Sequence, residues 1–386
     1  MDSSNLFNYS SGLANNRMLS RIYKNCNSNG NYNIVNCLFT DILKLYDKKI
    51  IPSDIYNLCK NTRYYNTDNS NISEGVSTWQ GMCKYKNGQI IICGTTLPSP
   101  KTGLGLLYFG NIQCNDVNQT NVVFNVPGAQ YTSCYGPRYD IEKNEFTLVG
   151  SYNLPNNSNN YGFLFKGKLN DLTNPDNYVY GMQVIENQYN DTFVHSTDGN
   201  FAVGASGPSK TLISAFIYNI SENKYTQYSF PNSQSTTIYG IVQNPDTSYT
   251  IVGGWSDSIN THGFITDMYY EGGNLTFLRE TSVDIPGLII SHHEGISKTN
   301  NPNIYTLAGD GLGQNNKGLG YTCIVERIEI ENKFIVKKTV NIDNYCQTNT
   351  VGITTVNSVL ENTIVGYFVS NTGKMSFQCA IDWNNI

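Results

Sequence analysis

The sequence has few charged residues: they make up 14% of its 386 positions, and the net charge is only −5. Binding to nucleic acid or to an anionic membrane surface needs a strongly basic face, so this balance argues against both partners. No apolar run reaches the roughly 18 residues of a membrane-spanning helix. The first residues also lack the basic and apolar regions of a secretory signal peptide. We therefore expect a soluble, non-secreted protein without membrane insertion.

Motifs that mark common enzyme chemistries are also missing. There is no Gly-x-Ser-x-Gly elbow, phosphate loop or dinucleotide fingerprint, so no cofactor is expected. None of the ten cysteines forms a Cys-x-x-Cys pair, which argues against a zinc knuckle or a redox motif. Adjacent residues of a regular strand point to opposite faces, so His292 and His293 cannot both ligate one ion. No metal site is therefore expected.

Aromatic residues, by contrast, are abundant at 12% of the chain, whereas disordered chains carry few, so the chain is globular. The cysteines are expected to be free thiols that pack as small hydrophobic side chains. Lys86–Gln89 reads Lys-Asn-Gly-Gln, which predicts a two-residue Asn-Gly hairpin. This register puts residue 83 opposite residue 92. It would place Cys83 and Cys93 on opposite faces of the sheet, where they cannot bond.

A short β-rich segment ending in glycine recurs six times along the chain. Successive glycines are 56, 54, 49, 56 and 57 residues apart, and each lies in a larger unit of four predicted strands. Four short antiparallel strands repeated at this period are typical of a β-propeller, in which radial packing buries both faces of every sheet. We expect each missing side chain to let backbones approach closely near the axis. The six glycines are Gly94, Gly150, Gly204, Gly253, Gly309 and Gly366.

The two ends of the repeated region predict how the ring closes. The last unit stops after its third strand, and Arg63–Asn66, just before the first unit, has the character of a fourth strand. The predicted fold is therefore all-β: a six-bladed propeller over residues 62–386, closed by an N-terminal strand. Residues 1–61 do not repeat and are predicted to form a small polar and helical appendage, either packed on the propeller or used for assembly. Helical spacing appears there at Ile34, Leu38, Ile42 and Leu45.

Two stretches carry a resemblance to known proteins. Thr236–Ile241 with Ser248–Ser256, and His293–Ile296 with Tyr305–Asp310, resemble uncharacterised propeller-type repeat proteins of bacteria and of giant, mimivirus-like viruses. The Asn-rich, Ala-poor composition is also similar to that of such a virus. The resemblance implies architecture over residues 62–386 and no catalytic residues. It further implies a virally encoded structural or host-interaction protein, located in the host cytoplasm or in the virion.

One first-strand position recurs in every unit and is the best candidate for a site, because propellers place ligands where the first strands converge. Its residues offer carboxylates, an imidazole and phenols, which could bind a cation, a sugar or a peptide amine. The same residues could instead only line a water-filled channel. Asp310, directly after a repeated glycine, is a further channel candidate. The recurring position is occupied by Glu74, Tyr135, His195, Tyr239, Glu294 and Val351.

The sequence favours a non-catalytic binding or structural protein over an enzyme. Tyr and Asn in loops suit a protein or a glycan, because aromatic faces pack on sugar rings while amides bond to hydroxyls. The alternative is a glycoside hydrolase-like enzyme that uses Glu74, Glu294 and Asp310. Carboxylates about 5 to 9.5 Å apart in a closed pocket would favour hydrolysis. Carboxylates dispersed around an open channel would favour binding.

Overall fold

The computed structural model describes most of the chain after residue 61, and in these parts the backbone is almost entirely β-strand. The predicted appendage, residues 1–61, lies outside the described residues, as does Glu74. Among the described residues no helix is long and apolar enough to cross a membrane. The described residues are 62–65, 76–99, 102–111, 120–157, 159–173, 182–185, 191–209, 212–257, 259–314, 317–342, 350–370, 373–381 and 383.

Sixteen of the strands form four separate antiparallel sheets of four strands each. The first contains β10 (Asp191–Asp198), β11 (Phe201–Ser209), β12 (Leu212–Asn219) and β13 (Lys224–Tyr228). The second contains β14 (Ser235–Gln243), β15 (Tyr249–Ser256), β16 (Thr261–Glu271) and β17 (Asn274–Ser282). The third contains β18 (Leu288–Lys298), β19 (Ile304–Gly313), β20 (Gly318–Ile328) and β21 (Lys333–Asn341). The fourth contains β22 (Thr350–Leu360), β23 (Thr363–Ser370), β24 (Gly373–Ala380) and β1 (Thr62–Tyr65).

The other eight strands form a single sheet made of two consecutive four-strand meanders. One parallel residue pair, Gly103 with Tyr131, joins the meanders between β4 and β6. Gly103 allows this approach, because a Cβ atom there would lie 2.4 Å from the Tyr131 ring. The expectation of six separate sheets is therefore not met. The meanders are β2 (Val76–Lys84), β3 (Gln89–Ser99), β4 (Thr102–Asn111), β5 (Thr120–Phe124), and β6 (Tyr131–Asp140), β7 (Glu145–Asn153), β8 (Tyr161–Gly167), β9 (Met182–Ile185).

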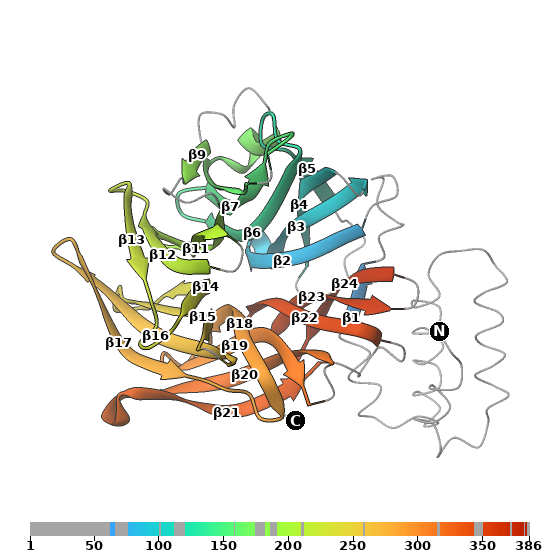
Figure 1. Ribbon diagram of the computed structural model, residues 1–386. Coiled ribbons are helices and arrows are strands. Elements are labelled where there is room, and N and C mark those ends of the chain that lie inside the picture. The colour runs from blue at the N-terminus through green and yellow to red at the C-terminus, as the bar shows by residue number, and fades with distance from the viewer. Residues whose placement is uncertain are drawn as a thin grey trace, which may run out of the picture.

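The sheets stand around a common axis in a propeller arrangement (Figure 1). Going along the chain, the inner strands β2, β6, β10, β14, β18 and β22 each contact the next one, and β22 contacts β2. The predicted closure is confirmed: β1 pairs antiparallel with β24, with Thr62 opposite Cys379 and Tyr65 opposite Ser376. The first strand of the described residues therefore completes the last sheet, and this pairing closes the ring.

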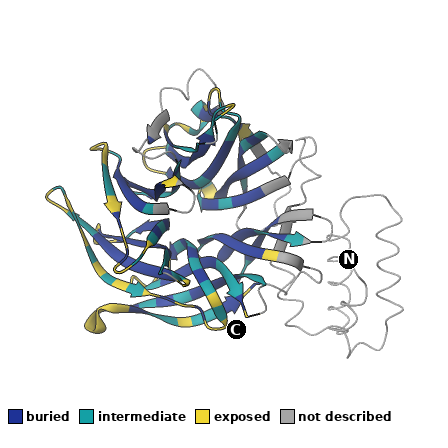
Figure 2. Ribbon diagram, viewed as in Figure 1, coloured by how far each residue is buried: buried dark blue, intermediate teal, exposed yellow. Residues whose placement is uncertain are grey.

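Burial follows from this radial packing, because each sheet has neighbours on both faces. Consecutive residues Ile90, Ile91 and Ile92 of β3 are all buried, and they belong to two different hydrophobic clusters, one on each side of the sheet. Outer strands have a freer face, and the residues of β17 alternate between exposed and half-buried along its whole length. Burial is most complete in second strands such as β7 and β15. Figure 2 shows exposed residues mainly at the outer hairpins.

The hairpin between β2 and β3 differs from its prediction by one residue. Its loop has three residues, Lys86–Gly88, with Asn87 and Gly88 both at positive φ (57° and 74°). Cys83 therefore lies opposite Ile91 rather than residue 92, which places Cys83 and Cys93 on the same face. The prediction of opposite faces is wrong. The prediction of free thiols is confirmed for the five described cysteines, four of which are buried.

Candidate functional site

All six inner strands have a β-bulge at one equivalent position, and β18 and β22 have a second irregularity nearer their beginnings. At the equivalent position the strand's register to its neighbour shifts by one residue, so that a single residue is left without a partner. A bulge re-aims the side chain of its extra residue. The six unpaired residues are Gln80, Tyr135, His195, Tyr239, Glu294 and Asn357.

The repeated glycines are explained by this bulge. Each one lies in the second strand, opposite the residue just before the bulge, as Gly253 lies opposite Ile238. A Cβ atom on Gly253 would be 1.9 Å from the carbonyl oxygen of Thr237, and the other five glycines face an equivalent carbonyl at 1.9 to 2.2 Å. The close approach is therefore made within one sheet. The expectation that these glycines serve convergence on the axis is wrong in that respect.

Convergence on the axis instead explains a second set of glycines, those directly after the bulge. A Cβ atom on Gly81 would lie 2.0 Å from the backbone oxygen of Tyr135, on the next inner strand. One on Gly295 would lie 3.0 Å from the Cα atom of Ser358, again on the next inner strand. These glycines let neighbouring inner strands pack closely around the axis.

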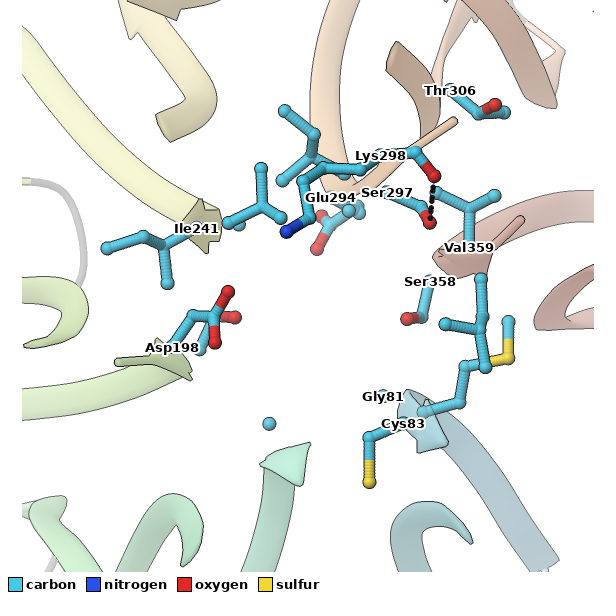
Figure 3. A pocket seen from close by; sticks show the side chains of 18 of the residues that line it. Gly81, Cys83, Asp198, Ile241, Glu294, Ser297, Lys298, Thr306, Ser358 and Val359 are labelled. Carbon is cyan, nitrogen blue, oxygen red and sulfur yellow. Dashed lines mark hydrogen bonds between the residues drawn. The ribbon is translucent and has the colours of Figure 1, made fainter. Parts of the chain in front are cut away.

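An axial cavity of about 810 Å³ opens beside the bulges, and all six bulge residues line it. Its walls are formed by the residues that follow each bulge along the inner strands, as far as Lys84, Arg138, Asp198 and Lys298. Figure 3 shows Glu294 and Lys298 of β18, and Asp198 of β10, directed toward its open centre. The volume lies in the range of small-molecule sites, about 300 to 1,000 Å³.

Aromatic rings of successive inner strands form a continuous row, and all but the last of them, His292, line the cavity. The ring centroids of Tyr135 and His195 are 5.2 Å apart, those of His195 and Tyr239 are 4.6 Å apart, and those of Tyr239 and His292 are 5.4 Å apart. Burial, with a smaller contribution from the charge of His292, lowers the pKa of His195 to about 3. His195 is therefore neutral at physiological pH, and this side of the cavity offers an uncharged aromatic surface.

Glu294 belongs to a compact polar cluster with His292 and Asp310. The Nε2 atom of His292 lies 2.7 Å from Oε1 of Glu294 and 2.9 Å from Oδ1 of Asp310. His292 and Glu294 are two residues apart on β18, and Asp310 on β19 is the direct cross-strand partner of His292. Of the three, Glu294 alone lines the cavity; His292 and Asp310 do not.

In this cluster the neighbouring charges shift the pKa of His292 in the direction opposite to the shift caused by burial. Burial lowers the pKa of His292, but the carboxylates of Asp310 and Glu294 outweigh it, and the pKa lies well above the ordinary value of 6.5. Burial raises the pKa of Glu294, and Asp310 raises it further, while His292 lowers it. Burial, with a contribution from Glu294, also raises the pKa of Tyr239 to about 12. The cluster is thus a charged imidazolium held between two carboxyl groups.

His293 points away from this cluster, as the alternation of a strand predicts. It is fully buried, and its Nδ1 atom lies 2.8 Å from the hydroxyl of Tyr321. Burial lowers its pKa to about 3. The two adjacent histidines therefore have separate roles: His293 belongs to the packing of the sheet and His292 to the axis.

Ion pairs connect neighbouring inner strands at the cavity mouth. Arg138 pairs with Asp198, and the Nζ atom of Lys84 lies 2.6 Å from Oε1 of Glu361. Lys298 Nζ donates a hydrogen bond to the backbone oxygen of Gln243 at 2.7 Å. The charged groups of the mouth contrast with the aromatic side of the cavity.

Sequence reasoning located four of the six bulge residues and misplaced two. The four residues predicted correctly are Tyr135, His195, Tyr239 and Glu294. In the other two units the sequence predicts Glu74 and Val351, but the residues at the bulge are Gln80 and Asn357. Spacing contained the signal, since Gln80 precedes its repeated glycine by 14 residues, as Tyr239 does. Asn357 precedes its glycine by nine residues, the spacing of His195, because both hairpins have short turns.

Comparisons with known proteins identify a fold and no family. No family profile matches the sequence, and no curated protein matches it. A protein of unknown function from Dyadobacter fermentans has a similar structure, with a TM-score of 0.53 and 9% identity over 83% of this chain and 98% of that one. Native Bacillus subtilis arabinanase aligns with a TM-score of 0.39 and 11% identity over 84% of this chain and 98% of that one. An exo-1,5-alpha-L-arabinanase from a bovine ruminal metagenomic library aligns with a TM-score of 0.40 and 9% identity over 67% of this chain and 96% of that one.

Proposed function

We propose that the protein is a non-catalytic binding propeller whose axial cavity takes a carbohydrate. The observation that carries this proposal is that the six bulge side chains all line one cavity of about 810 Å³. The cavity holds the two kinds of group that sugars use. Tyr135 and Tyr239 offer aromatic surface, while Gln80, Glu294 and Asn357 offer hydrogen-bonding groups.

The arrangement of the carboxylates supports binding over hydrolysis. The nearest atoms of Glu294 and Asp310 lie within 4.8 Å of one another, and both face the same nitrogen of His292. Retaining glycosidases hold their two carboxyl groups about 5 to 5.5 Å apart across the scissile bond, and inverting ones about 6.5 to 9.5 Å apart. Asp310 does not line the cavity, and both carboxylates contact one imidazole nitrogen, so this pair has no room for a glycosidic bond between its members.

A glycan array with the purified full-length protein tests the proposal, followed by a reducing-sugar assay on every glycan that binds. We expect binding without turnover. We expect Glu294→Gln to raise the dissociation constant about tenfold or more, because it loses a charge-assisted hydrogen bond. Glu142→Gln, an exposed residue in the turn after β6, is the matched control and should bind as the unaltered protein does. Release of reducing sugar would instead establish the glycosidase alternative. An array without any hits would remove the carbohydrate proposal.

We also propose that the ring has six blades, with the eight-stranded sheet counted as two. One parallel pair joins its halves, whereas each half is a complete antiparallel meander with its own bulge and its own repeated glycine. A crystal structure tests this count, because the proposal requires the inner strands β2 and β6 to stand as separate blades around the axis.

The proposed biological setting rests on the sequence resemblance alone. A virion or host-interaction role, with a protein or a glycan as partner, remains a proposal that the structural comparisons do not address. Mass spectrometry of purified virus particles from the source tests it, and absence of the protein from the particles would remove the virion role.

A further inference from the structure

We propose that His292, Glu294 and Asp310 bind a divalent transition-metal ion at the propeller axis. The ligand atoms are Nε2 of His292 and one carboxylate oxygen each from Glu294 and Asp310. These three atoms all lie within 4.8 Å of one another, the one such group found among the described residues. The cluster shares Glu294 with the proposed carbohydrate site, whereas its other two members, His292 and Asp310, do not line the cavity.

The cluster has fewer hydrogen-bond donors than its two carboxylate oxygens need. The single proton on His292 Nε2 faces two carboxylate oxygens, at 2.7 Å for Glu294 and 2.9 Å for Asp310. It bonds to Glu294, and the Oδ1 atom of Asp310 is left buried without a hydrogen bond. Asp310 Oδ1 thus has only its ion pair with the imidazolium that it shares with Glu294. Buried acceptors that lack a hydrogen bond are costly and rare in folded proteins. A cation in place of the proton would satisfy all three atoms together.

The size and chemistry of the cluster fit a first-row ion. Such ions bind nitrogen and oxygen at about 2.0 to 2.2 Å, which puts neighbouring ligand atoms roughly 3 to 3.6 Å apart. The two nitrogen–oxygen distances, 2.7 and 2.9 Å, are slightly shorter, so small side-chain rotations open the space needed. One imidazole with two carboxylates suits Mn²⁺ or Zn²⁺, whereas Ca²⁺ takes six to eight oxygen ligands.

The surrounding structure holds the ligands in place. All three residues are on strands, and the Tyr239 ring packs against the imidazole of His292 at a centroid distance of 5.4 Å. The hydroxyl of Tyr321 donates to the backbone oxygen of His292 at 2.8 Å. Three protein ligands leave further coordination positions free, and Glu294 lines the cavity. The ion would therefore be reached from the cavity by water or by a ligand hydroxyl.

Calorimetric titration of the chelator-treated full-length protein with MnCl₂ tests the proposal. Mn²⁺ is the probe because the ten cysteines bind it far less well than they bind Zn²⁺. We expect one equivalent to bind, and Asp310→Asn and His292→Gln each to raise the dissociation constant about tenfold or more. Glu294→Gln gives a second reading should either variant fail to fold, as judged by circular dichroism.

His262→Gln is the matched control. This histidine also lies beside two carboxylates, with Nδ1 3.0 Å from Asp284 and Nε2 3.7 Å from Asp257, but it is outside the cavity. We expect its Mn²⁺ affinity to equal that of the unaltered protein. The proposal is overturned if the unaltered protein binds no Mn²⁺, or if folded cluster variants bind it as tightly as His262→Gln does. Mn²⁺ binding by a protein that binds no glycan would leave this proposal standing and remove the other.

Discussion

Replacing a repeated glycine by alanine should destabilise the protein strongly, and Gly253 gives the sharpest case. Its Cβ atom would lie 1.9 Å from the carbonyl oxygen of Thr237, 2.8 Å from the Phe264 ring and 3.0 Å from the Cα atom of Ile238. The first and third of these atoms belong to the backbone of β14, so no side-chain rotation relieves the clash. Strand β14 must move away from β15, and the bulge that aims Tyr239 at the axis moves with it.

The magnitude follows from how much backbone must shift. Overpacking a core typically costs about 1 to 3 kcal/mol, and a contact with fixed backbone belongs at the upper end, so we expect Gly253→Ala to cost about 3 kcal/mol or more. Gly167→Ala is the control. The nearest atom to its Cβ would be the tip of the Phe165 ring at 3.0 Å, in a flexible side chain, and we expect a cost of about 1 kcal/mol or less.

Urea unfolding of both variants, followed by tryptophan fluorescence and by circular dichroism, measures the difference. The midpoint of Gly253→Ala should fall well below that of Gly167→Ala, with a similar slope. Equal midpoints for the two variants would refute the reasoning. They would show that the close approach between the glycine and the bulge carbonyl is absent from the folded protein.

Three further predictions concern other parts of the ring. Asp267 is fully buried and pairs with Arg327 at 2.6 Å and with Arg279 at 2.8 Å. Asp267→Asn leaves the buried guanidinium of Arg327 without its carboxylate, although Arg279 keeps Glu329, and should cost about 3 to 5 kcal/mol in urea unfolding. A loss under about 1 kcal/mol would contradict this. Burial raises the pKa of Cys323 to about 12, so its thiolate is scarce until the pH approaches that value. Mass spectrometry should find it unmodified by iodoacetamide at pH 8 in the folded protein and modified after unfolding, whereas labelling of the folded protein would argue against its burial. Deleting Thr62–Tyr65 within the full chain leaves β24 as an open edge, so we expect a lower melting temperature and more aggregation, measured by light scattering; unchanged behaviour would argue against ring closure.

Most of the fold could be predicted from the sequence because the repeat is periodic and its signals are local. The glycine spacing gives the number of units, and the strand character of Arg63–Asn66 predicts the pairing of β1 with β24. The parallel contact of Gly103 with Tyr131, which merges two meanders into one sheet, could not be predicted. It is a single long-range contact between strands of different units, and no local pattern encodes it.

The candidate site was predictable only in part, for two physical reasons. A bulge adds one residue without a sequence signature of its own. The repeats therefore had to be aligned on their hairpin turns, and this alignment missed Gln80 and Asn357. The polar cluster depends on a cross-strand pair: Asp310 lies opposite His292, 18 positions earlier in the chain. Comparing His292 only with the adjacent His293 therefore could not predict its partners on the same face of the sheet, Glu294 and Asp310.

The account depends on the axial cavity being the place where a ligand binds. A crystal structure of the protein with a glycan identified by the array tests this most directly. We predict electron density for the sugar inside the cavity, in contact with Glu294 and against the ring of Tyr239. Density for the sugar at an outer hairpin, with the cavity holding only water, would contradict the account.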